Sequence, residues 1–148
     1  EPWIELLMHL PKTKRENISR LFYYFTEHQP DVVHAWQDET NILVGMAALM
    51  AGVPRILFSA RSLSPDSKTM LHMRLRGYLR GCYRQLLSAE RVVLCHNSEA
   101  GASSYRKWLE ITDVNTVTEN EYGPLTKKLY VNLVTLTEQN LYKILLVL

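Results

Sequence analysis

Three short apolar segments, each followed by a longer helical pattern, constrain the fold of this chain more than any other feature. The apolar segments are rich in β-branched or aromatic residues, as buried strands are, and they are residues 31–36, 55–60 and 91–96. The helical patterns that follow them are residues 41–51, 68–89 and 98–109. Strand, helix and strand joined this closely form right-handed crossovers between parallel strands. The sequence therefore predicts an α/β fold, a Rossmann-like parallel sheet flanked by helices.

Local signals also indicate where helices begin. An additional helix is expected at residues 18–28, where apolar residues recur at helical spacing. Asp38 or Thr40 is expected to cap the helix that follows the first strand, because a side-chain oxygen there can accept from a free backbone N–H. Asn97 and Ser98 are expected to cap the helix that follows the third strand in the same way.

Composition places the chain among ordinary globular domains. Its 148 residues are 47% hydrophobic and 22% charged, which excludes a disordered tail or a disulfide scaffold. Cys82 and Cys95 are expected to be free, buried thiols, and this fits a reducing compartment. No Cys/His spacing resembles a zinc site and no G-x-G-x-x-G occurs, so we expect neither a metal nor a resident cofactor. No apolar run reaches the roughly 18 residues of a membrane span.

The alternation of strands and helices ends after residue 112, and this predicts the domain organisation. Residues 1–112 are expected to form the Rossmann-like domain. Within the tail at residues 113–148, residues 127–136 could be helix or strand, and residues 142–148 are typical of a buried strand. The tail is expected to hold a linker and the first strand of a second domain. Since the chain opens without an initiator Met and ends on an apolar run, a fragment of a longer protein is expected.

Polar side chains gather where the predicted strands end. Ligands of open parallel sheets bind at the carboxyl ends of the strands, so these positions are candidate site residues. His34 could contact a hydroxyl group of a ligand, and Arg61 could hold phosphate by paired hydrogen bonds; these are the candidate catalytic residues. His96 is expected to be structural, because capping residues follow it. The candidate substrate-binding residues are Trp36, Gln37, Asp38, Ser59, Ser62, Asn97 and Ser98.

These candidates have structural alternatives that the sequence leaves open. His34 could instead hydrogen-bond a neighbouring loop. Arg61 could form an ion pair with Asp38 or Asp66 and hold its own loop. Trp36 could pack against the protein rather than stack on a ligand.

Three motifs follow one another between residues 30 and 111. They are PDVVHAWQ at residues 30–37, AGVPRI with SARS at residues 51–62, and NSEAG leading to YRKWL at residues 97–109. In order and spacing, this set resembles the N-terminal domain of GT-B fold glycosyltransferases of the retaining, family 4 type, which act in bacterial polysaccharide synthesis. Each motif alone is weak, and the three in register are more specific.

The resemblance implies a glycosyltransferase that moves a sugar from a nucleotide-sugar donor to a glycan or a lipid-linked acceptor. This chain would be part of the acceptor half, inactive alone, because a further domain supplies most donor contacts. The alternative function is a non-catalytic α/β module for interaction or assembly, with self-association through an uncovered sheet edge.

A basic stripe marks the predicted helix at residues 68–89. Arg76, Arg80 and Arg84 recur every four residues, and the segment contains no acidic residue. We expect contact with an anionic membrane surface or with phosphate, and a solvated face is the alternative. This implies a cytoplasmic location, peripheral to the inner membrane. A net charge of +2 and the lack of a nucleic-acid binding motif argue against nucleic acid as a partner.

Overall fold

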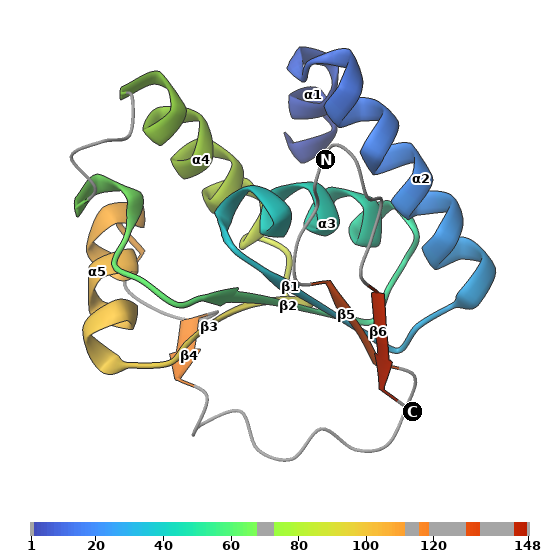
Figure 1. The fold of residues 1–148 in the computed structure, drawn as a ribbon. Helices are drawn as coiled ribbons and strands as arrows, with labels where there is room; N and C mark the ends of the chain where they lie inside the picture. Colours follow the sequence, from blue (N-terminus) through green and yellow to red (C-terminus); the bar gives the residue numbers. More distant parts are fainter. Residues whose placement is uncertain (1, 68–72, 112–115, 119–129, 134–143, 148) are drawn as a thin grey trace.

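A mixed sheet with helices packed against it forms the structure (Figure 1). The computed structural model describes residues 2–67, 73–111, 116–118, 130–133 and 144–147. Its helices are α1 (Pro2–His9), α2 (Lys12–His28), α3 (Asp38–Met50), α4 (Met73–Leu86) and α5 (Glu99–Leu109), with a short 3-10 helix at Pro65–Ser67. Its strands are β1 (Val32–Trp36), β2 (Arg55–Ala60), β3 (Val92–His96), β4 (Thr116–Thr118), β5 (Tyr130–Leu133) and β6 (Ile144–Val147).

The order of the strands confirms the predicted Rossmann-like parallel sheet. The order across the sheet is β4-β3-β2-β1-β5-β6, in which β1 to β5 are parallel and β6 is antiparallel to β5. The chain steps outward from β1 to β4, and β5 then lies on the other side of β1. The strand order therefore reverses beside β1, which is where open α/β sheets bind their ligands.

Most predicted elements lie within a few residues of the observed ones. The helix expected at residues 18–28 begins earlier, at Lys12, and α1 was not predicted. The part of the third predicted helix at residues 68–72 lies outside the described residues. In the tail, the segment that could be helix or strand contains β5, and β6 joins the same sheet through β5. The division of the chain at residue 112 stays a prediction.

The cap predicted for α3 is wrong. The helix begins at Asp38 itself, so Gln37 is the capping residue and makes no side-chain cap bond. Asp38 and Thr40 lie inside the first turn, past the position from which a side chain can accept from the free N–H groups. By contrast, the cap predicted for α5 is confirmed, since the Ser98 side chain accepts a hydrogen bond from the backbone N–H of Gly101.

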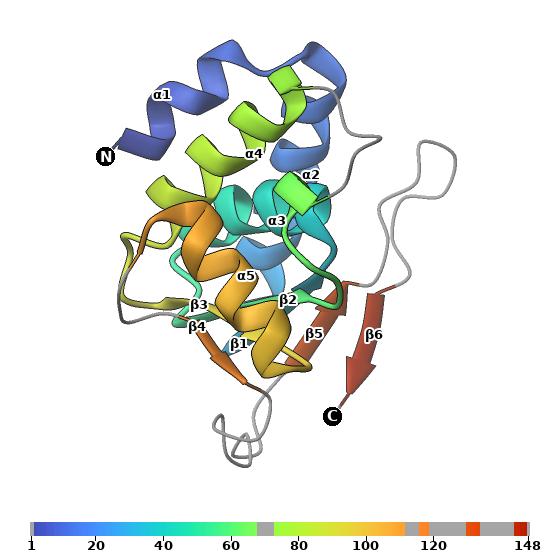
Figure 2. The same ribbon diagram turned by 90° about the vertical axis from the view of Figure 1, so that its left-hand side faces the viewer.

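The core lies between one face of the sheet and helices α2 to α5 (Figures 1 and 2). Side chains alternate between the faces of a strand, so every second residue of β1 to β3 enters this core. The buried residues of these strands on the helical side are Val33, Ala35, Ile56, Phe58, Ala60, Val92 and Leu94. On the opposite face Val32, Leu57 and Cys95 form a smaller buried cluster. The strands are therefore apolar on both faces, as strands of a parallel sheet usually are.

Gly45 allows α3 to approach the sheet closely. A Cβ at this position would lie 2.4 Å from the ring of Phe58 and 3.3 Å from a methyl of Leu86. Both side chains are fully buried, so neither can move aside freely. The small residue at position 45 thus fixes how deeply α3 packs between β2 and α4.

We predict that Gly45→Ala lowers the free energy of unfolding by about 1–3 kcal/mol, because the added methyl overpacks the core. Urea denaturation followed by circular dichroism measures the change. Gly81→Ala on α4 is the matched control: its Cβ meets no atom within 4 Å. That variant should be neutral or more stable by up to about 1 kcal/mol. Equal stability of Gly45→Ala and the parent protein would contradict the packing described.

Candidate functional site

Four of the predicted site residues lie together at the carboxyl ends of β1 and β2. Trp36 pairs with Ser59 across the two strands, so His34, Trp36 and Ser59 share one face of the sheet. The His34 Nε2 atom lies 2.5 Å from the Ser59 Oγ atom. The His34 and Trp36 rings stack with centroids 4.6 Å apart, and the Arg61 guanidinium carbon lies 4.1 Å from the Trp36 ring centroid. His34, Trp36, Ser59 and Arg61 are called the rim cluster below.

The rim cluster combines a neutral imidazole with an exposed cation. Burial, together with the positive charge of Arg61, lowers the pKa of His34 to about 4, so its ring is neutral at physiological pH. A neutral imidazole has one nitrogen that donates and one that accepts. Arg61 is exposed at the end of β2, whereas Ser59 is buried. This arrangement offers hydrogen bonding, an aromatic surface and a positive charge at a single edge of the sheet.

The stacking of Arg61 on Trp36 is a contact that the sequence did not reveal. It gives Trp36 a role in positioning the cation as well as in packing against His34. The loop that follows Arg61 is tied to α5, because Ser104 Oγ accepts from the backbone N–H of Ser64 at 3.0 Å and lies 2.9 Å from Ser64 Oγ. Ser62 is exposed in this loop. The loop is thus held at the same edge of the sheet as the rim cluster.

Asp38 accepts hydrogen bonds from two buried tyrosines. The hydroxyls of Tyr83 on α4 and Tyr105 on α5 donate to Asp38 Oδ1 at 2.9 Å and 2.6 Å. Burial and the nearby charge of Asp38 raise the pKa of both tyrosines well above the usual range of a tyrosine hydroxyl. This carboxylate oxygen therefore joins three helices. A predicted substrate-binding residue is engaged in a structural network.

Asn41 connects that network to the rim cluster. It is completely buried, and its Nδ2 donates to the Tyr83 hydroxyl at 2.9 Å and to the Ser59 carbonyl at 3.2 Å. Ser59 in turn contacts His34 through its side chain. Ser59 thus joins the two faces of the sheet: its side chain contacts His34 on one face, and its carbonyl is linked through Asn41 to Tyr83 of α4 on the other. Asp38, Asn41, Tyr83 and Tyr105 are called the Asp38 network below.

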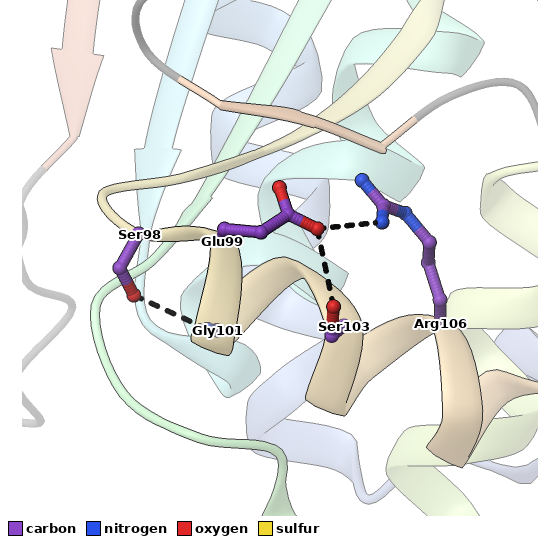
Figure 3. A network of polar contacts seen from close by, with 5 residues as sticks. All are labelled: Ser98, Glu99, Gly101, Ser103 and Arg106. Atoms are coloured by element: carbon purple, nitrogen blue, oxygen red, sulfur yellow. Dashed lines mark hydrogen bonds and ion pairs between the residues drawn. The ribbon is translucent and has the colours of Figure 1, made fainter.

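The predicted residues after β3 lie at the beginning of α5 (Figure 3). The Ser98 Oγ accepts from the Gly101 N–H at 3.1 Å and caps the helix. Glu99 Oε1 accepts hydrogen bonds from the Ser103 hydroxyl at 3.1 Å and from the Arg106 guanidinium at 3.0 Å. These bonds lower the pKa of Glu99, and the bond from Arg106 is the largest cause. Asn97 is exposed beside them. Ser98 therefore caps α5, as predicted, while its contact with a substrate stays a prediction.

His96 is buried at the end of β3. It is 1% exposed and packs against the Tyr105 ring, with centroids 4.9 Å apart. Neither ring nitrogen has a hydrogen-bond partner among the residues that the structure describes. Burial, followed by the charge of Arg106, lowers the pKa of His96 to about 4. The helix cap next to His96 is made by Ser98, as predicted, and His96 itself is packed in the protein.

The basic stripe receives its compensating charge from a distant residue. Glu110, at the end of α5, pairs with Arg80 at 2.7 Å and with Arg84 at 3.2 Å. The sequence showed no acid on the helix itself, and pairing across 26 residues could not be read from it. The side chain of Arg76 lies outside the described residues. Contact of this stripe with a membrane or with phosphate stays a prediction.

Other classes of site leave no trace in the described part of the chain. Within it, no group of three or more His, Cys, Asp or Glu side chains is arranged to hold a metal ion. None of its helices has the length and apolar character needed to cross a bilayer. Cys82 and Cys95 are free and buried.

Comparison with known proteins finds a relative that is named for polysaccharide biosynthesis. It is 30% identical over 106 residues to the Vi polysaccharide biosynthesis protein VipC/TviE of Salmonella typhi. The match includes 72% of this chain but only 18% of that protein, so the chain spans less than a fifth of its relative. No family profile matches the chain. No solved structure matches it.

We predict that Asp38→Ala destabilises the protein by about 2–5 kcal/mol, because two buried hydroxyls lose their acceptor. Urea unfolding measures this change. Glu39→Ala is the matched control, since the neighbouring Glu39 is exposed and pairs with Lys14 at the surface. It should cost less than about 1 kcal/mol. A similar, small cost in both variants would show that the Asp38 network does not hold the helices.

Stability should also depend on His34 and His96. In the unfolded chain each histidine takes up a proton near its ordinary pKa of 6.5, whereas in the folded protein each does so only near 4. Stability is therefore lost as pH falls from about 6.5 to 4, by up to about 1.4 kcal/mol per pH unit for each histidine. Urea unfolding at a series of pH values should show a shallower slope for His34→Gln and a still shallower one for the double variant with His96→Gln. Unchanged slopes would contradict the burial of these rings.

Proposed function

We propose that this chain belongs to a glycosyltransferase of polysaccharide synthesis, acting on the acceptor side. The enzyme would transfer a sugar from a nucleotide-sugar donor to a glycan or a lipid-linked acceptor in the cytoplasm. The rim cluster is the observation that carries the proposal, because it lies beside the reversal of strand order in a parallel sheet. The similarity to a polysaccharide biosynthesis protein supports the same class of chemistry.

The chemistry of the rim cluster suits a sugar ligand. The neutral ring of His34, whose Nε2 contacts Ser59 Oγ, can share a hydrogen bond with a hydroxyl group without demanding a charged partner. Gln37 and Asn97, both exposed at this edge, add amide groups of the same kind, and Ser62 adds a hydroxyl. Arg61 supplies a positive charge suited to a phosphate oxygen. We assign His34 to the contact with a sugar or acceptor hydroxyl and Arg61 to the leaving diphosphate.

The helices at this edge favour an acceptor over the donor diphosphate. A helix N-terminus attracts anions, and a diphosphate would normally occupy such a position. In this chain α3 begins with Asp38 and α5 begins with Glu99, so acidic side chains already stand at both helix ends. Additional negative charge is disfavoured there. Arg61, which lies outside both helices, is then the group that meets the donor phosphates, and other parts of the enzyme supply the remaining contacts.

We predict that Arg61→Ala weakens binding of the donor at least tenfold, because the phosphate loses its guanidinium partner. Saturation-transfer NMR with UDP- and GDP-sugars on the complete protein measures the binding. Arg55→Ala is the matched control, since Arg55 is an exposed arginine at the opposite end of the same strand. It should bind as the parent protein does. Absence of binding by every donor, or an equal loss in both variants, would contradict the proposed function.

A further inference from the structure

The backbone at Gln37 adopts a conformation that glycine normally occupies. Three described non-glycine residues have a positive φ, namely Gln29, Gln37 and Glu110. Gln29 (φ 46°, ψ 56°) and Glu110 (φ 54°, ψ 42°) end helices in the ordinary left-handed conformation. Gln37, with φ 73° and ψ 148°, lies between β1 and α3 near a region that is costly for any residue with a side chain.

Hydrogen bonds from buried groups hold this strained turn. The backbone N–H of Gln37 donates to the Ser59 carbonyl at 3.2 Å, and the Gln37 carbonyl accepts from the Asn41 N–H at 2.8 Å. The buried side chain of Asn41 donates to the same Ser59 carbonyl. The Asp38 network therefore fixes the turn on both sides. Strain of this kind persists only where the surrounding structure enforces it.

The packing of the protein does not explain why position 37 is a glutamine. Its side chain is exposed and does not belong to the core, and it makes no cap bond to α3. A glycine would adopt this backbone with less strain. The position lies immediately after Trp36, at the edge that carries the rim cluster. The exposed carboxamide is therefore placed where it can meet a ligand at the rim cluster.

We propose that Gln37 selects the acceptor sugar by hydrogen-bonding two neighbouring hydroxyls of a pyranose at the rim cluster. This inference rests on the proposed function. A carboxamide has both donors and an acceptor, which matches the two kinds of hydrogen bond that a hydroxyl pair forms. Because the turn is fixed before the ligand arrives, less conformational freedom is lost on binding. Gln37 is thus a specificity-determining residue in a preorganised position.

Two substitutions in the complete protein separate the strain from the side chain. Gln37→Gly removes both the strain and the carboxamide, whereas Gln37→Ala removes the carboxamide and keeps the strain. Binding is measured by saturation-transfer NMR with methyl glycosides of glucose, galactose, N-acetylglucosamine and N-acetylgalactosamine. We expect both variants to bind the preferred glycoside at least tenfold more weakly. Only Gln37→Gly should raise the thermal unfolding midpoint, by about 2–4 °C.

Gln29→Gly is the matched control, because it relaxes a positive φ that precedes the start of β1, whereas the rim cluster lies at the carboxyl end of that strand. It should not weaken binding of the glycoside. Binding by both Gln37 variants at the parental level would overturn the proposal, and so would a lower midpoint for Gln37→Gly. If the parent protein binds neither donors nor glycosides, the proposed function fails and takes this inference with it. If the parent binds and the Gln37 variants bind equally well, only this inference fails.

Discussion

The parallel pairing of β1, β2 and β3 is the constraint on which the rest of the structure depends. In-register pairing places Trp36 opposite Ser59 and Ala60 opposite His96, so that three strands end at one edge. Antiparallel pairing would have sent alternate strand ends to opposite edges. The ring of His34 and the cation of Arg61 both contact Trp36 only because of this arrangement. The site is therefore a consequence of the topology and of the residues that happen to end each strand.

The Asp38 network stabilises that edge from the side of the sheet that the helices cover. One carboxylate oxygen of Asp38 accepts hydrogen bonds from Tyr83 on α4 and Tyr105 on α5. Asn41 links Tyr83 to the backbone of β2. These hydrogen bonds form only when α3, α4 and α5 are placed as described, so the network favours one arrangement of the helices over alternatives. The same network holds the strained turn at Gln37. Packing and site geometry are thus joined through a few residues.

The local patterns of the sequence were sufficient for β1 to β3, for most helices and for the direction of pairing of these strands, but not for β4. Valine-rich runs such as residues 31–36 indicate strands, and short connections require parallel crossovers. The Ser98 cap followed from its position just ahead of a helical pattern. The strain at Gln37 could not be predicted, because glutamine is not a typical turn residue.

The contacts that couple distant elements were beyond local patterns. Tyr105 reaches Asp38 across 67 residues, and Glu110 reaches Arg84 across 26. Helical periodicity indicates which side of a helix faces the sheet, but not how far the helix is displaced along it. That displacement decides which hydroxyl meets which carboxylate. For the same reason the sequence indicates Asp38 as a candidate substrate-binding residue but does not reveal its hydrogen bonds to Tyr83 and Tyr105.

The central claim is that the carboxyl edge of β1 and β2 binds the substrates of sugar transfer. A crystal structure of the complete protein with a nucleoside diphosphate and an oligosaccharide acceptor tests it most directly. The account predicts phosphate oxygens at Arg61 and sugar hydroxyls within hydrogen-bond distance of His34. Ligands bound at the opposite edge, near Pro30 and Pro54, with the rim cluster free of contacts, would contradict it.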